Sequence, residues 1–424
     1  MHLSRRNLLL ASSAAAVFGR SAISRAASAP PKNFILVFAN GGWDVTYCMD
    51  PKVSIEGVME GPDLDPGSNA TDSETITSFG DIPIRSNPVL RGNADDFFTT
   101  WGSRTHVVNG IWTGSIAHAP CRIRLFTGSS NQLSPDSATI FGYETASAEP
   151  LGTVDMSGLS FPGPLAASTG RIGFQSQIKA LVDPADQWDT PLFRPAGHEQ
   201  AGIDTYLAAR AAALGDLRAD GGVNDARIAG LLESRDRAAR FKSEGGIEAM
   251  AGLELGRTPS FVEQAEMAAD MLSRGLCRAL VLGTGSDWDT HIINFSQNAF
   301  YENLFLGLGT LADALDQAQL LDSTLVVVMS EMTRTPIFND SGGKDHWAHT
   351  SALMFGGPVR GNATSGETTD DFLESIPMNL ATGVPDPAGE LCKYDNLTAG
   401  ILEMLGVDAE EWLPGVTPFL GAQA

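Results

Sequence analysis

Acidic and imidazole side chains gather in one short part of the chain, directly after an apolar run at 325–330. Fewer than twenty residues hold two acids, an arginine and two histidines: Glu331, Arg334, Asp345, His346 and His349. Carboxylates and imidazoles are the ligands of Zn²⁺ and similar divalent ions. The alternative is structural, with Asp345 capping a turn and the histidines packing against Trp347. This segment alone does not separate a metal site from packing.

Two further groups of acids and imidazoles also follow apolar runs. The run 33–39 leads to Asp44, and the run 278–283 leads to Asp287, Asp289 and His291. The carboxyl ends of parallel strands open into one crevice, where ligand sites lie. Taken alone, Asp44 is equally well explained as the cap of a helix. Three groups at one sheet edge nevertheless favour a shared metal site over coincidence.

Another imidazole, His118, follows a predicted strand at 105–109 and begins a predicted helix. The partial positive charge of the first helical amides lowers an imidazole pKa and favours a neutral, ligating ring. Arg122 and Arg124 stand on the next turn. Arginines suit an anionic substrate group, and Arg124 or Arg334 is our candidate for that role. A solvated helix face is the alternative.

The apolar runs predict an α/β fold with a mostly parallel central sheet and helices on both faces. Residues 298–318 show helical spacing and predict a crossover helix packed on the sheet before the strand at 325–330. Further helices are predicted at 95–101, 261–276 and 394–406, and a surface loop at 60–90.

Residues 140–260 depart from this pattern. Pro, Gly and Ser are frequent as far as 195, and helical spacing follows at 203–217 and 225–241. We predict an inserted, mainly helical cap or side layer within one α/β domain at 30–424. Its charged residues are typical of a wet surface.

Residues 1–29 read as an export signal. Adjacent arginines, Arg5 and Arg6, precede a short apolar run and then small residues. This order indicates the twin-arginine machinery as a partner and a periplasmic or extracellular location. A membrane anchor is the alternative, but the run 8–18 is too short to span a bilayer. We therefore expect no stable membrane span after cleavage between Ser24 and Ala29.

The composition excludes several classes of partner. The formal charge is −23, and the segment 1–29 holds four arginines and no acid, so its removal gives −23 − 4 = −27. Such a protein repels nucleic acid and anionic lipid. Four cysteines without a C-x-x-C pair are too few for a disulfide scaffold and do not suit a structural zinc module. One disulfide bridge between two of these cysteines is possible, and the sequence does not indicate which two.

Four motifs resemble those of twin-arginine-exported bacterial proteins known as domain of unknown function family 1501. They are Gly-Gly-Trp-Asp at 41–44, Trp-Asp-Thr-His at 288–291, Ser-Glu-Met-Thr-Arg-Thr-Pro at 330–336 and Gly-Gly-Lys-Asp-His-Trp at 342–347. More distantly, the chain is similar to the alkaline phosphatase and sulfatase superfamily, which implies an alkaline-phosphatase-like fold. In that resemblance Glu331 stands for a strand-end Asp and His346 for the last histidine ligand. Asp44 resembles the first-strand acid, although Asn40 is its strict equivalent.

The superfamily resemblance implies hydrolysis of a phosphate or sulfate ester at metal ions. Residues 118–128 are similar to the sulfatase signature, except that His118 occupies the place of the nucleophile and Cys121 comes three residues too late. His118 then ligates a metal, acts as base for a water, or marks lost hydrolase chemistry.

We therefore expect an exported, metal-dependent hydrolase-like protein that acts on phosphate or sulfate esters through metal-activated water. Zinc is the first choice of ion, with manganese, iron or calcium as alternatives, and the substrate is a small anion or a carbohydrate. The alternative is a non-catalytic periplasmic protein that keeps the superfamily fold and binds a metal or sugar. The expected catalytic residues are His118, Arg124 and Arg334, and the expected metal ligands are Asp44, Asp289, His291, Glu331, Asp345, His346 and, in reserve, His349.

Overall fold

The structure is a computed structural model that describes most of the chain. The described residues are 31–52, 74–146, 149–172, 197–217, 223–251, 253 and 257–424. The predicted export signal at 1–29 lies outside them.

The central element is an eight-stranded sheet in the order β12-β4-β11-β8-β1-β7-β5-β6. Only β11 runs opposite to its neighbours, so the prediction of a mostly parallel sheet is confirmed. The strands are β1 (Asn33–Phe38), β4 (Thr105–Trp112), β5 (Thr153–Asp155), β6 (Thr169–Arg171), β7 (Ala279–Gly283), β8 (Thr324–Met329), β11 (His349–Gly356) and β12 (Ala363–Ser365).

The centre of the sheet is buried on both faces, which explains the continuous apolar runs of β1 and β8. Successive side chains of β1 alternate between two cores. Ile35 and Val37 enter the first core. Phe34, Leu36 and Phe38 enter the second.

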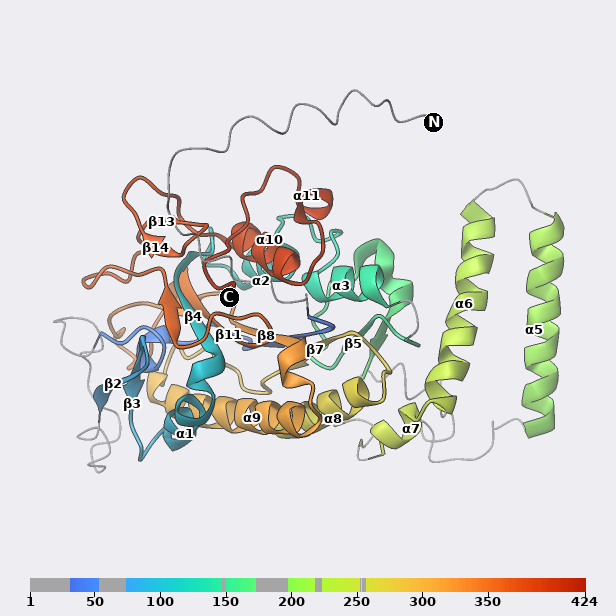
Figure 1. Cartoon of the computed structure of the whole chain (residues 1–424), viewed down its shortest axis with the longest axis horizontal. Coiled ribbons are helices and arrows are strands. Elements are labelled where there is room, and N and C mark those ends of the chain that lie inside the picture. The colour runs from blue at the N-terminus through green and yellow to red at the C-terminus, as the bar shows by residue number, and fades with distance from the viewer. Residues whose placement is uncertain are drawn as a thin grey trace, which may run out of the picture.

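Helices cover both faces of the sheet, as predicted (Figure 1). One face carries α1 (Gly92–Trp101), α8 (Phe261–Ser273) and the crossover helix α9 (Gln297–Gln317). The other carries α2 (His118–Thr127), α3 (Ser137–Thr145) and α10 (Tyr394–Met404), with the short α11 (Ala409–Trp412) beyond α10.

The region 140–260 contributes to two parts of the molecule. Strands β5 and β6 extend the central sheet. Helices α5 (Gly197–Leu217) and α6 (Val223–Ser243) stand side by side at one end of the molecule, followed by the short α7 (Gly246–Ala249) (Figure 1). A cap formed by this region stays a prediction.

The predicted surface loop at 60–90 is wrong in its second half. Strands β2 (Thr75–Phe79) and β3 (Ile82–Ser86) form an antiparallel hairpin there. Ile82 and Ile84 are fully buried. Alternating isoleucines therefore outweigh the Gly and Pro content of the segment, which favours a loop.

Several chain segments meet at the carboxyl edge of the sheet. β1, β7 and β8 end there, and the antiparallel β11 begins there. Just before β11, the two-residue strand β10 (His346–Trp347) pairs with β9 (Thr333–Arg334). The reversed direction of β11 thus brings residues that precede a strand to the edge where the other strands end.

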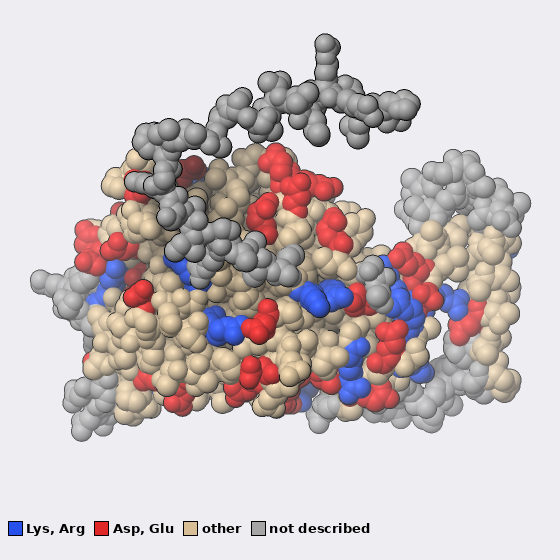
Figure 2. All heavy atoms as spheres, viewed as in Figure 1, with Lys and Arg blue, Asp and Glu red and all other residues tan. Residues whose placement is uncertain are grey.

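The described residues show no helix that is long and apolar enough to cross a membrane. All four cysteines are buried and unpaired. Acidic side chains are spread over the face in Figure 2, often with basic side chains beside them.

Candidate metal centre

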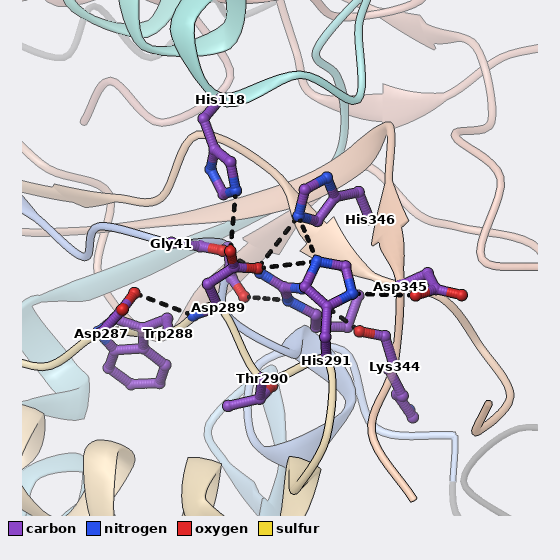
Figure 3. Close-up of polar contacts among 12 residues, drawn as sticks. Gly41, His118, Asp287, Trp288, Asp289, Thr290, His291, Lys344, Asp345 and His346 are labelled. Carbon is purple, nitrogen blue, oxygen red and sulfur yellow. Dashed lines mark hydrogen bonds and ion pairs between the residues drawn. The ribbon is translucent and has the colours of Figure 1, made fainter. Parts of the chain in front are cut away.

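Three histidines surround the carboxylate of Asp289 at this sheet edge (Figure 3). The Nε2 atoms of His291 and His346 are 2.9 Å apart, and each lies 3.1 Å from Asp289 Oδ1. His118 Nε2 lies 3.3 Å from Asp289 Oδ2. Residues from α2, from the loop after β7 and from β10 therefore share one small space.

The other ring nitrogen of each histidine has a hydrogen-bond acceptor. His118 Nδ1 is 2.9 Å from Glu331 Oε1, and His291 Nδ1 is 2.9 Å from Asp345 Oδ1. His346 Nδ1 is 2.8 Å from the carbonyl oxygen of Ile116. A carbonyl oxygen only accepts, so Nδ1 of His346 carries the proton. This pattern fixes metal-binding histidines in proteins and leaves each Nε2 lone pair pointing at the shared space.

Lone pairs gathered in this way repel one another unless a cation lies between them. Burial lowers the pKa of His346 even though the Asp289 carboxylate lies beside its ring, so an added proton is disfavoured there. Zinc ligands about 2.0 to 2.2 Å from the ion lie roughly 3.3 Å from one another in a tetrahedral site. The distances among Nε2 of His291, Nε2 of His346 and Oδ1 of Asp289, 2.9, 3.1 and 3.1 Å, are close to that spacing. The donor set therefore fits a divalent transition metal.

His118 extends the group, and its hydrogen bond with Glu331 raises the pKa of the ring, whereas its place at the start of α2 predicts a lowered pKa. Together with Asp289 and His346 it offers ligand atoms that all lie within 4.8 Å of one another. Its Nε2 is buried and makes no hydrogen bond to any described residue. Such a buried lone pair favours a bound ion or a reacting molecule beside it.

Asp289 stays ionised in this setting. Burial raises the pKa of its carboxyl, but the neighbouring His346 and Arg334 outweigh that effect and lower the pKa to about 2. Arg334 Nη2 donates to Asp289 Oδ1 over 2.8 Å. The carboxylate therefore brings a full negative charge to the shared space at neutral pH.

Glu331 lies behind His118. It is fully buried, and both of its oxygens accept hydrogen bonds of 3.0 Å from the amide of Gly41. Arg122 Nε donates to the same carboxylate over 3.3 Å. The structure thus places Glu331 where it orients His118, and Asp345 has the equivalent place behind His291.

The loop after β1 must approach the loop after β7 closely. Gly41 has a φ of 121°, and a Cβ there would lie 2.6 Å from the amide nitrogen of Asp289. The buried rings of Trp43, Trp288 and Tyr301 pack together beneath these loops, with 4.9 Å between the centroids of Trp288 and Tyr301. Glycine and an aromatic cluster therefore fix the position of Asp289.

Asp44, an expected ligand, does not join the histidines. Its carboxylate is fully buried, lies 2.7 Å from Lys344 Nζ and accepts hydrogen bonds from Thr46 and Asn294. Burial raises the pKa of Asp44, but Lys344 and these hydrogen bonds lower it overall. The carboxylate caps the short helix Val45–Tyr47, which was the structural alternative.

Three more expected site residues make other contacts. His349 lies against Ser375 and Trp347. Arg334 is fully buried, and it donates to the carbonyl oxygens of the loop after β1 as well as to Asp289, so it has no face for a substrate. Arg124 donates to Thr113 and Ser130. We therefore leave these residues out of the proposed centre.

Sequence reasoning underestimated two residues. Arg122 had been named only as one of several arginines, yet its spacing from His118, one helical turn, places both side chains on one face of α2. Lys344 was not singled out. A lysine inside a Gly-Gly-Lys-Asp-His turn gives no signal that it is buried against an acid 300 residues away (344 − 44).

The protein is thus an α/β protein with a histidine and aspartate cluster at the carboxyl edge of its sheet. A family model described as "Protein of unknown function (DUF1501)" matches residues 31–417. The chain belongs to this family, as its motifs predicted. No curated relative matches the sequence.

Solved structures with a similar arrangement come from the alkaline phosphatase superfamily and from sulfatases. A superfamily protein from Vibrio parahaemolyticus is 10% identical, with a TM-score of 0.42 over 93% of this chain and 72% of that chain. A putative sulfatase from Bacteroides fragilis is 9% identical, with a TM-score of 0.37 over 92% and 80%. TAB5 alkaline phosphatase, in a mutant with magnesium bound, is 12% identical, with a TM-score of 0.38 over 89% and 99%. At this similarity, the chemistry of the chain must be argued from its own residues.

Proposed function

We propose that the protein is a metal-dependent hydrolase of phosphate or sulfate esters. The observation that carries the proposal is the convergence of three imidazole Nε2 lone pairs on one ionised carboxylate. Asp289, His291 and His346 hold the ion in this proposal. A divalent ion bound there supplies a Lewis acid that polarises an ester oxygen and lowers the pKa of a water.

His118 is the proposed general base. Its Nδ1 donates to the buried Glu331 carboxylate, so the ring is oriented and its Nε2 lone pair points toward the centre. A histidine oriented by a carboxylate in this way can accept a proton from an attacking water and pass it to a leaving group. This role also explains a histidine where the sulfatase signature has its nucleophile.

Arg122 is the proposed anion-binding residue. It reaches the same centre through Glu331, and its side chain is 28% exposed, whereas that of Arg334 is fully buried. A guanidinium presents paired donors that match the oxygens of a phosphate or sulfate group. Arg122 thus takes the role that the sequence had assigned to Arg334 or Arg124.

The rival function is metal binding without catalysis. Structural zinc sites are closed by four protein ligands, whereas catalytic sites keep one position open. If His118 is a ligand, it completes a closed set with Asp289, His291 and His346. The role of His118 therefore decides between the two functions.

The test combines elemental analysis of the full mature chain with assays on aryl phosphates and aryl sulfates. We expect one zinc, manganese or iron ion per chain and turnover of one ester class. The variant His118→Ala should keep the ion and lose at least about 100-fold in turnover, the contribution of a general base. Loss of the ion in His118→Ala, or a metal-loaded chain inert on both ester classes, would favour the rival.

Export remains part of the proposal. It rests on the sequence of residues 1–29, where adjacent arginines precede a short apolar run. Mass spectrometry of the protein recovered from the producing cell should find a chain that begins between residues 25 and 30 and lies outside the cytoplasm. A cytoplasmic chain that retains Arg5 and Arg6 would contradict it.

A further inference from the structure

A cavity of about 240 Å³ lies at the end of α2, where Arg124 and the residues that follow the helix line it. The end of β4, the end of α2 and the beginning of α10 surround it, and Figure 1 shows α2 and α10 next to each other above the sheet. The residues of interest in its lining are Trp112, Gly114, Arg124, Ser130, Lys393 and Asp395. None of them contributes to the proposed hydrolysis.

Backbone contacts bring these residues together from distant parts of the chain. The amide of Trp112 donates to the carbonyl oxygen of Cys392 over 2.7 Å, which ties the last residue of β4 to the segment before α10. Lys393 Nζ then lies 5.7 Å from the ring centroid of Trp112. The cavity is therefore a fixed feature of the fold.

Arg124 is held in a defined orientation. Its Nε donates to Ser130 Oγ over 3.2 Å and its Nη1 to the carbonyl oxygen of Thr113 over 3.1 Å. These neutral partners fix the guanidinium plane and leave its charge uncompensated. The Nη2 group makes no hydrogen bond to a described residue, so it is available to a ligand.

Glycine makes room for this guanidinium. Gly114 has a φ of 70°, and a Cβ at that position would lie 2.7 Å from Arg124 Nη1. Since that contact is too short, the guanidinium occupies the space that any other residue at 114 would fill. A substitution at Gly114 should therefore displace Arg124 without altering it.

The cavity carries a local positive charge on an acidic protein. In the described part of the chain, neither Arg124 nor Lys393 forms an ion pair. Asp395 is the one acid among the described lining residues, and its carboxylate caps the amide of Asn396. The first turn of α10, where the helix dipole also favours negative charge, closes one side.

We propose that this cavity binds an anionic carbohydrate, with a sulfate or carboxylate group between Arg124 and Lys393. The aromatic face of Trp112 offers an apolar surface to a sugar ring, and the Ser130 hydroxyl and the Asp395 carboxylate suit sugar hydroxyls. The volume is below the roughly 300 to 1,000 Å³ of sites for drug-sized ligands, so one sugar unit fits. None of the residues that line this site belongs to the proposed metal centre.

The test is a calorimetric titration of the full mature chain with a sulfated disaccharide and with its desulfated counterpart. We expect the sulfated sugar to bind at least about tenfold more tightly, since a charge-assisted contact is worth that much. Lys393→Gln and Arg124→Lys should each lower affinity for the sulfated sugar about tenfold, because Lys393→Gln removes a charge and Arg124→Lys removes the paired donors. Gly114→Ala should act in the same direction.

Arg104→Gln is the matched control, because Arg104 precedes the opposite end of β4 and pairs with Asp322. It should leave the affinity unchanged. Thermal unfolding identifies variants that fail to fold. Lys393 is exposed, so Lys393→Gln should fold normally and tests the proposal even if another variant does not fold. Equal affinity for the two sugars, no binding by the unmodified chain, or unchanged binding by Lys393→Gln would overturn the proposal. His346→Ala should lose metal and keep sugar binding, which separates this proposal from the hydrolase proposal.

Discussion

The buried His106 and the histidines of the proposed metal centre differ in what their second ring nitrogen meets. His106 is fully buried, with Arg360 and Ser365 as partners of its two nitrogens, and the half-buried His349 has its Nδ1 against Ser375. In the centre, each Nδ1 has an acceptor and each Nε2 faces other lone pairs. A histidine with satisfied nitrogens stabilises packing, whereas one with an oriented and unshared lone pair can bind a cation.

The largest expected effect comes from breaking this contrast at two neighbouring histidines. His346→Ala should lower metal affinity more than about 100-fold, the upper figure for residues that only support a ligand. His349→Ala should keep the full metal content, since its contacts are Ser375 and Trp347. Elemental analysis and competition with a chelator measure both. Equal metal loss in the two variants would contradict the contrast.

The next effect concerns the buried ion pair of Asp44 and Lys344. Lys344→Met leaves the Asp44 carboxylate buried without its cation, which should lower the free energy of unfolding by about 3 to 5 kcal/mol. Denaturant unfolding measures the change. Adding Asp44→Asn should recover part of the loss because the stranded charge is gone. A change below about 1 kcal/mol would mean that the pair does not anchor the loops.

Acid should destabilise the fold through the buried His106. Burial lowers the pKa of His106 to about 4. Below the unfolded value of about 6.5 the unfolded chain binds a proton that the folded chain does not, so stability falls as the pH drops from about 6.5 to 4. The loss due to His106 is roughly 3 kcal/mol at the acid end. The free energy of unfolding of His106→Asn should depend less on pH in this window than that of the unmodified protein. Equal slopes of this free energy against pH would refute the assignment.

The smallest expected effect concerns Asp345, which orients the proposed metal ligand His291 through a hydrogen bond. Asp345→Asn keeps an acceptor for His291 Nδ1 but removes its charge, so metal affinity should fall about tenfold, the lower figure for such partners. Stability should not change, since the Asp345 side chain is 61% exposed. Asp340→Asn, a change at another exposed acid of the same loop, is the control. A chelator competition titration that gives the two variants the same metal affinity would contradict a role for Asp345 in the proposed centre.

Much of the fold could be predicted because its signal is local. The apolar runs of β1, β7 and β8 and the helical spacing of α9 are properties of single segments, and each lies where the sequence predicted it. Strands β5 and β6 have three residues each, too few to show a period, and they were missed.

The roles within the site were harder to predict because they depend on distant partners. Asp44 and Asp289 each follow a tryptophan at the end of a buried strand, and no local feature distinguishes them. Lys344 neutralises the first, whereas imidazoles surround the second. Sequence therefore predicted that these residues meet at one edge of the sheet and could not say which acid lies among the histidines.

The histidines of the centre are far apart in the chain: 228 residues separate His118 from His346 (346 − 118). An unfolded chain holds them at separations that no single ion can bridge, so the ion should bind only after β11 has docked beside β4 and β8. Metal uptake would then be a late step of maturation and a direct report of completed folding. A transport route that carries folded proteins, such as the twin-arginine route, would deliver this protein with its centre already assembled.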